Sequence, residues 1–353
     1  PRSAARPPRP DYRLSPEVRC DWDEASCTQL VYLYNELAVK HHGDAHHLFR
    51  LLGKPRPEYG DKPCVRMASI DIGGGTTDLS IATFELSSGE GDTARITPHM
   101  EFRDGFNIAG DEVLREVVAK HFLPALSEAF TAAGLAEPRV LLGMLFGRDA
   151  IGMSQEDRNL RGRFVRQVAV PAALGMLAAC EGLGSDAMTG GLSGGSGGAF
   201  TCRLGDFFEP LPGETSNAPD TPVREFVQPA PRPQERVIKA VEEAVRRAAP
   251  QAADFRLMDV ELRIIPAAIE TTIKTTLGPS LTDLCEPAHL YDCDLLLLTG
   301  RPSVWSGVVA PVLAKLPVPP DRIVPMRQYH VGAWYPFADV LGRITDPKTT
   351  VVV

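Results

Sequence analysis

Residues 71–78 read DIGGGTTD, three consecutive glycines in a segment with an aspartate at each end, and this segment constrains the fold more than any other. The residues before it, 65–70, and those after it, 79–86, are apolar and rich in residues that favour strands. Two strands joined by a glycine-rich turn predict a β-hairpin. A third strand is expected at about residues 95–102.

The composition of this turn is typical of a phosphate-binding loop. Three successive glycines let backbone N–H groups approach an anion without an intervening Cβ, and the two threonine hydroxyls add donors. The two aspartates would repel a phosphate, so they are expected to hold Mg²⁺, usually through its waters, or to orient an attacking water. An ordinary hairpin turn is the alternative, but such a turn needs only one or two glycines.

A second candidate site follows the last apolar strand that the sequence predicts, residues 294–298. Gly300 allows a close approach of the backbone to a base or ribose, and Ser303 could cap the helix expected from about residue 304. Arg301 could stack on adenine or contact the α-phosphate. A plain strand–helix loop with a capping serine is the alternative.

A third candidate is Glu24, in the first turn of a helix expected at residues 23–40 and ended by Gly43. Its carboxylate could position the waters of Mg²⁺ or the attacking water. It could equally be a first-turn carboxylate that the helix dipole favours.

These segments resemble, in the same order, elements of the actin-like ATPase superfamily, which includes the heat-shock chaperones, the sugar kinases and the bacterial actins. Residues 24–35 resemble its first connecting helix, 71–78 its second phosphate motif, 104–111 the entry to its lid subdomain, 296–303 its adenosine motif and 346–353 the start of its second connecting helix. The chain is most similar to the SrfB virulence-factor family of bacteria, through QLVYLYNE at 29–36, DIGGGTTD, LLLLTGRPS at 295–303 and DPKTT at 346–350.

The resemblance implies an α/β chain with the C-terminal half of the actin-like ATPase (ribonuclease H-like) fold and a large inserted lid subdomain. Residues 1–22 would be a tail or linker, 23–64 the first connecting helix and a loop, 65–103 and 281–353 the nucleotide-binding core, and 104–280 the lid. The superfamily's first phosphate loop has no counterpart before Asp71. We therefore expect the chain to be part of a longer protein, whose other half hydrolysis would need.

The expected function is ATP binding with Mg²⁺, and hydrolysis in the full-length protein. The alternatives are an interaction scaffold without turnover and a filament-forming relative of the bacterial actins. The residues to which the turn chemistry and the resemblance assign roles are, for catalysis, Asp71 and Glu24; for magnesium, Asp71 and Asp78; and for the nucleotide, Gly73, Gly74, Gly75, Thr76, Thr77, Gly300, Arg301 and Ser303.

Composition narrows the class of partner. The 353 residues include 37 basic and 45 acidic side chains, a net charge of -8, which disfavours a nucleic-acid binder. The seven cysteines form no CxxC pair and fit a reducing compartment. No apolar stretch long enough to span a membrane and no signal peptide are recognised, so a cytoplasmic protein is expected, with a protein partner bound through the lid.

Within the expected lid the pattern is less regular. Residues 182–198 are rich in glycine and serine and 210–233 in proline, so both are expected to be loops. The other expected elements are helices that begin at Asp111 and span 171–180, 235–249 and 280–290, and a strand at 163–170.

Overall fold

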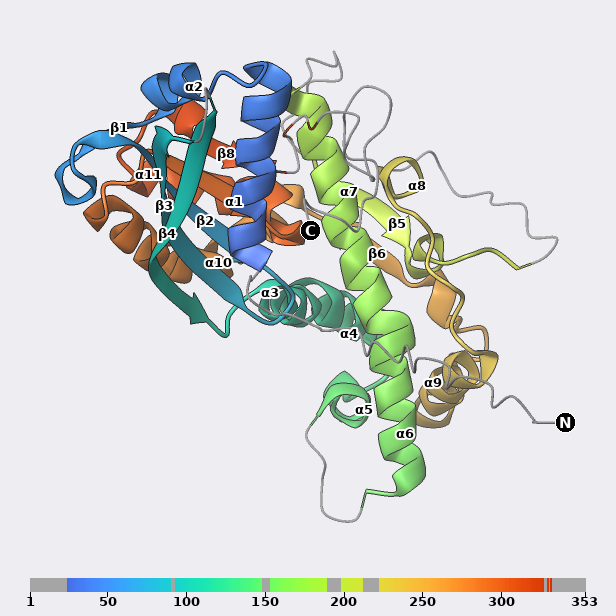
Figure 1. The fold of residues 1–353 in the computed structure, drawn as a ribbon. Helices are drawn as coiled ribbons and strands as arrows, with labels where there is room; N and C mark the ends of the chain where they lie inside the picture. The colour runs from blue at the N-terminus through green and yellow to red at the C-terminus, as the bar shows by residue number, and fades with distance from the viewer. Residues whose placement is uncertain are drawn as a thin grey trace, which may run out of the picture.

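The computed structural model describes residues 24–89, 93–147, 153–188, 198–211 and 222–326, together with Tyr329 and Val331. The tail expected at 1–22 and the segment at 346–353 lie outside these residues, as do residues 189–197 and 212–221 of the two loops expected at 182–198 and 210–233. The described residues form a mixed α/β structure, in which one large sheet packs beside a group of helices (Figure 1).

Among the described residues, six strands form the main sheet, and the glycine turn joins two of them. Their order is β4-β3-β2-β7-β8, and β1 pairs with the first residues of β2. β3 is antiparallel to β2 and β4, whereas β7 is parallel to β2 and β8 is parallel to β7. The expected hairpin and third strand are confirmed. The strands are β1 (Lys54–Arg56), β2 (Lys62–Ile72), β3 (Thr77–Ser88), β4 (Ala94–Phe106), β7 (Leu295–Thr299) and β8 (Ile323–Pro325).

Successive side chains of β2 point to opposite faces of the sheet. Met67 packs with α1 (Glu24–Tyr34) and α2 (Ala45–Leu52) on one face, whereas Ile70 belongs to the core with α10 (Pro266–Leu290) and α11 (Ser306–Lys315) on the other. Asp71 has the same parity as Met67. Its carboxylate therefore lies on the α1 face, at the carboxyl end of β2.

The first helix ends as expected. α1 continues through a π-helical turn at Asn35–Lys40, and the chain then reverses at Gly43, whose φ is +86°. α10 begins at Pro266, well before its expected start at 280, because a proline is well suited to the first turn of a helix. It then runs through Pro279 and Pro287.

The chain between β4 and α10 is mostly helical, and its helices extend away from the main sheet (Figure 1). A two-stranded sheet of β5 and β6 lies among them. A single apolar core continues from these helices to the α10 side of the main sheet. The elements are α3 (Gly110–Val117), a π-helical turn (Val118–Phe122), α4 (Leu123–Ala132), α5 (Pro138–Phe146), α6 (Gln155–Phe164), α7 (Val170–Met188), β5 (Phe200–Arg203), α8 (Pro222–Phe226), α9 (Glu235–Ala248) and β6 (Glu261–Ile264).

The strand expected at 163–170 is wrong. α6, a π-helical turn at Val165–Ala169 and α7 form one continuous helix there, which also extends into the segment expected to be a glycine-rich loop. The valines of this segment favour a strand, but Phe164, Val168 and Ala172 are fully buried four residues apart, which is helical spacing. Tertiary packing thus overrides the local preference.

Within the described residues, one helix is long and apolar enough to cross a membrane by length and composition, namely Gln155–Leu183. The sequence interpretation had recognised no such stretch, because it divided this helix into a strand and a shorter helix. Half of the helix's apolar window is buried inside the protein.

A buried arginine joins β2, β3 and β4 at the end of the sheet opposite to the glycine turn. Arg66 is 7% exposed, and its guanidinium donates to Thr83 Oγ1 at 2.7 Å and to Glu58 Oε1 at 2.6 Å. Burial alone would raise the pKa of Glu101, but hydrogen bonds from Thr83 and Tyr59 and the charge of Arg66 outweigh it, so this pKa lies below its usual value.

We expect Arg66→Met to lower the free energy of unfolding at pH 7 by about 2–3 kcal/mol, because it removes the hydrogen bonds of a buried guanidinium to buried Thr83 and half-buried Glu101. The folded pKa of Glu101 lies below the unfolded value of about 4.3. Its contribution to stability is therefore complete above that value and is lost as the pH falls through the folded pKa.

Urea unfolding of wild type and Arg66→Met at pH 7, 5 and 3 tests this expectation, with Arg50→Met on an exposed position of α2 as the control. The deficit should shrink between pH 5 and pH 3. An equal deficit at all three values would show that the ionisation of Glu101 is not coupled to this cluster.

Candidate functional site

The glycine turn is fixed to the first residues of α3. Gly73 donates its amide to Thr76 O at 2.9 Å, which closes the turn. The amide of Gly110 donates to Gly73 O at 3.0 Å, and the amide of Asp111 donates to Gly74 O at 2.7 Å. Within the described chain, the amides of residues 74–76 donate no hydrogen bond to another backbone group. The turn is thus held by its carbonyls, while three amides remain for another acceptor.

Neither backbone conformation nor packing requires glycine at two of the three positions. None of Gly73, Gly74 and Gly75 has a positive φ. A Cβ built on Gly75 would meet nothing within 4 Å, and one on Gly74 would lie in ordinary contact, 3.6 Å from Asp111 Oδ1. The missing side chains leave space beside the turn, and unpaired amides next to open space suit an anion.

The two aspartates that bound the turn lie directly opposite each other in the β2–β3 ladder. Asp71 is 7% exposed, and its Oδ1 accepts a hydrogen bond from the hydroxyl of Thr299. Asp78 is exposed, and its Oδ2 accepts from Thr76 Oγ1 at 2.8 Å. Like charges at directly opposed positions destabilise a sheet, and a bound cation would relieve this repulsion.

Asp78 also depends on a glycine in the next strand. Gly105 lies opposite it in β4, and a Cβ at that position would come within 2.5 Å of Asp78 Oδ1. The absence of this side chain makes room for the carboxylate at the edge of the turn.

The hydroxyl of Thr77 does not point toward the predicted phosphate position. Thr77 is 1% exposed, and its Oγ1 donates to Ile108 O at 2.7 Å. It lies one residue before Asp78 in the strand, so its side chain faces the opposite side of the sheet. The structure corrects this expectation: the Thr77 hydroxyl anchors the segment that leads into α3.

The loop predicted to contact adenosine lies beside the glycine turn. Gly300 has a φ of +81°, and a Cβ there would lie 1.9 Å from Ile72 O, so the approach of β7 to the end of β2 requires glycine. A Cβ on Gly110 would lie 3.1 Å from Gly73 O and 3.3 Å from Pro302 Cγ. The turn, the start of α3 and the loop at 300–303 therefore meet around Gly110.

Ser303 supports this loop from within the protein. It is fully buried, and its Oγ donates to Gly300 O at 2.7 Å. It lies inside the short 3-10 turn at Arg301–Val304, whose N-cap is Gly300, and α11 follows Trp305 without a side-chain cap, so the expected capping role of Ser303 is wrong. Since its hydroxyl is buried and bonded, we assign Ser303 to the shape of the loop and not to direct contact with a ligand.

Arg301 of the same loop reaches the group of helices. Its Nη1 donates to Glu181 Oε1 at 3.1 Å, and its Nη2 lies 2.8 Å from Glu181 Oε2. Sequence reasoning missed Glu181, which lies 120 residues from Arg301 in the chain.

The start of α1 lies over the two aspartate-bearing strands. Ser69 of β2 donates its hydroxyl to Ala25 O at 2.9 Å, and the hydroxyls of Ser26 and Ser80 lie 3.3 Å apart. Ser69 lies two residues before Asp71, and Ser80 lies two residues after Asp78. All four side chains are therefore on the same face of the sheet. Glu24 begins this helix, and its side chain lies outside the described residues.

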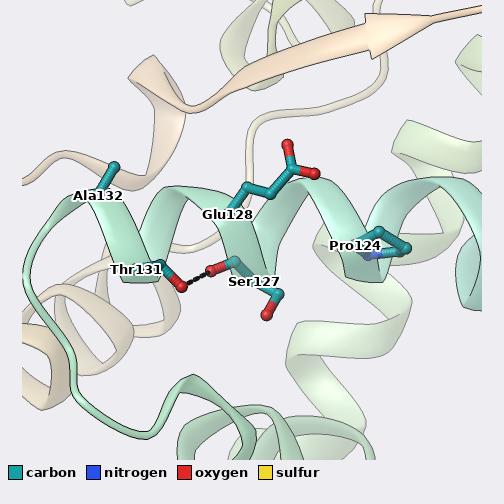
Figure 2. A pocket seen from close by; sticks show the side chains of 5 residues that line it. All are labelled: Pro124, Ser127, Glu128, Thr131 and Ala132. Atoms are coloured by element: carbon teal, nitrogen blue, oxygen red, sulfur yellow. Dashed lines mark hydrogen bonds between the residues drawn. The ribbon is translucent and has the colours of Figure 1, made fainter.

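Other features add no ligand set at the turn. Within the described residues, no group of three His, Cys, Asp or Glu side chains lies close enough to hold a metal ion directly. The shallow hollow in Figure 2 is lined by residues of α4 alone, where Thr131 Oγ1 donates to Ser127 O at 2.9 Å, and it does not include the glycine turn.

The structure adds two residues to the site that sequence reasoning did not single out. Thr299 orients Asp71, and Asp111 lies beside Gly74 at the start of α3. Both occur in segments that sequence reasoning had selected, 296–303 and 104–111. Only the strand pairing and the position of α3 bring them to the turn.

A comparison with protein families gives one match: a family model described as Virulence factor SrfB matches residues 4–353. No curated protein matches the chain.

We expect Gly300→Ala to destabilise the protein by on the order of 3 kcal/mol, because it combines a left-handed φ with a clash against Ile72 O. Gly75→Ala is the matched control, since its Cβ meets no atom and its φ is not positive. Thermal unfolding followed by circular dichroism should show a lower midpoint for Gly300→Ala alone. Equal midpoints for the two variants would contradict the described packing of this loop on β2.

Proposed function

We propose that this chain, which belongs to the SrfB virulence factor family, binds ATP with Mg²⁺ at the glycine turn, as part of an actin-like ATPase module. The observation that carries this proposal is the open space beside Gly74 and Gly75, next to three amides without a backbone acceptor. Two directly opposed carboxylates bound the same turn. A turn shaped only by its own packing would need neither feature.

In this proposal the backbone amides of Gly74, Gly75 and Thr76 hold the β- and γ-phosphates. The Thr76 hydroxyl now donates to Asp78 and can turn toward a phosphate oxygen by rotation about χ1. The carbonyls of Gly73 and Gly74 face α3 and accept its first amides, so they point away from the bound anion. This arrangement avoids the repulsion between carbonyl and phosphate oxygens.

The residues at the turn fit Mg²⁺ bound together with a nucleotide. Carboxylate oxygens are the protein ligands this ion prefers, and it commonly keeps several waters and binds the phosphates through the rest of its shell. When bound, it would neutralise the charge of the phosphates. Asp71, oriented by Thr299, would order the ion's waters or the attacking water, and Asp78 would support the turn or the same waters.

The topology of the sheet supports the finer fold proposal. A central hairpin and third strand, with β3 antiparallel to both of its neighbours and β7 and β8 added in parallel, is the arrangement expected of a ribonuclease H-like core. The helices between β4 and β7 occupy the position expected for a lid inserted after the hairpin. A protein partner bound through this lid and a cytoplasmic location stay predictions.

Slow hydrolysis in the full-length protein is the second part of the proposal, with Asp71 and Glu24 as the acidic residues that orient water. Phosphate release measured with Mg-ATP would separate an ATPase from a scaffold that only binds. The bound form would then differ from the free form in how the core and lid close on the nucleotide.

We expect calorimetric titration of the full-length protein with Mg-ATP to show binding, and Gly74→Val to weaken it at least about tenfold, a loss of about 1.4 kcal/mol. The valine would fill the space beside the turn without meeting a protein backbone atom, so the fold should persist. Asp71→Asn should reduce the gain in affinity that Mg²⁺ provides, because it removes a negative charge near the ion.

Gly278→Val is the control for Gly74→Val, because a Cβ on Gly278 meets nothing within 4 Å and the residue lies in α10, away from the turn. This control should bind Mg-ATP as wild type does. Absence of binding to folded wild-type protein, or equal binding by wild type and Gly74→Val, would refute the proposed phosphate site.

A further inference from the structure

A carboxylate stands alone in an otherwise uncharged stretch of α7. Between Val170 and Leu183, Glu181 is the only charged residue. Its side chain is 19% exposed, whereas that of its partner Arg301 is 39% exposed. A charge placed on an apolar helix and turned inward costs free energy unless a partner compensates it.

The compensation comes from an arginine of a distant segment. Arg301 approaches Glu181 with both terminal nitrogens, one within hydrogen-bonding distance of each carboxylate oxygen. Burial raises the pKa of Glu181 above its usual value, and the charge and hydrogen bond of Arg301 act against that rise. The charge of Arg301 thus favours the ionised form of Glu181 against the effect of burial.

The Arg301–Glu181 pair is not expected to contribute much to the free energy of unfolding. Partly buried ion pairs add little net stability, because the cost of desolvation offsets the attraction of the charges. The pair does order the arginine: a free arginine side chain has many rotamers, and Glu181 fixes that of Arg301 before any ligand arrives. The ordered guanidinium belongs to the loop beside the glycine turn.

The geometry points to Glu181 as a positioning residue for Arg301. We infer that the pair offers a nucleotide the flat face of a pre-ordered guanidinium, at the nucleoside end of the ligand. This inference rests on the proposed function. Each terminal nitrogen of Arg301 lies close to a carboxylate oxygen of Glu181, which directs the guanidinium toward α7, while its planar face can stack on an aromatic ring.

The charge of the Arg301–Glu181 pair also favours a contact of Arg301 with the nucleoside and not with the phosphates. With its charge neutralised by Glu181, Arg301 attracts the phosphates little. The phosphates are left to the amides of the turn and to Mg²⁺. Removal of Glu181 should therefore disturb the recognition of the nucleoside and leave the recognition of a bare polyphosphate unchanged.

The test compares Mg-ATP with magnesium tripolyphosphate, a ligand with the phosphate chain but no nucleoside, by calorimetry on the full-length protein. Glu181→Gln should weaken ATP binding about three- to tenfold, because Arg301 must then be ordered by the ligand itself. Its affinity for tripolyphosphate should equal that of wild type. Arg301→Lys, which keeps the charge but loses the planar group, should show the same pattern.

Glu235→Gln is the control, since it removes an ion pair with Lys239 on the exposed face of α9 and should change neither affinity. A general loss of structure in Glu181→Gln would weaken both ligands in parallel, and that result would overturn the positioning role. Unchanged or tighter ATP binding by Glu181→Gln would overturn it as well. If wild type binds both ligands, those results leave the proposed phosphate site intact; if wild type binds neither, both proposals fail.

Discussion

The pairing of β2 with a strand on each side is the interaction on which the rest of the structure depends. β3 brings Asp78 opposite Asp71, and β7 brings Thr299 beside the same carboxylate. Gly300, which follows β7, lets the backbone pass close to Ile72 at the end of β2. A shift of one residue in either register would separate Asp71 from its partner on the shifted strand, because the side chain of that partner would turn to the other face.

The parts of the fold that local sequence specifies were predictable. The hairpin, the helix at α9 and the end of the first helix at Gly43 each have a pattern complete within a few residues. The long helix through Val165–Ala169 was not predictable locally, because its valines favour a strand and only burial against distant elements makes it a helix. Three-residue strands such as β8 carry too few residues for an alternating pattern to appear.

The candidate site also has features that the local sequence predicts and features that it does not. The composition of the turn by itself indicates phosphate binding, since glycines, threonines and aspartates lie within one short segment. The orientation of the Thr77 hydroxyl depends on the boundary between turn and strand, which composition does not give. The partnership of Arg301 with Glu181 joins segments 120 residues apart, and no pattern within either segment indicates it.

The hydrogen bonds between the turn and α3 have a mechanical consequence. From Gly110 to Ala132 the chain is continuously helical, with a rise of about 1.5 Å per residue, so this rod is on the order of 30 Å long. One end is bonded to the carbonyls of Gly73 and Gly74, and α4 at the other end packs against α5 and β6. Because the helical segment is long, a small rotation of its first residues at the glycine turn would displace the residues at its other end by several ångströms.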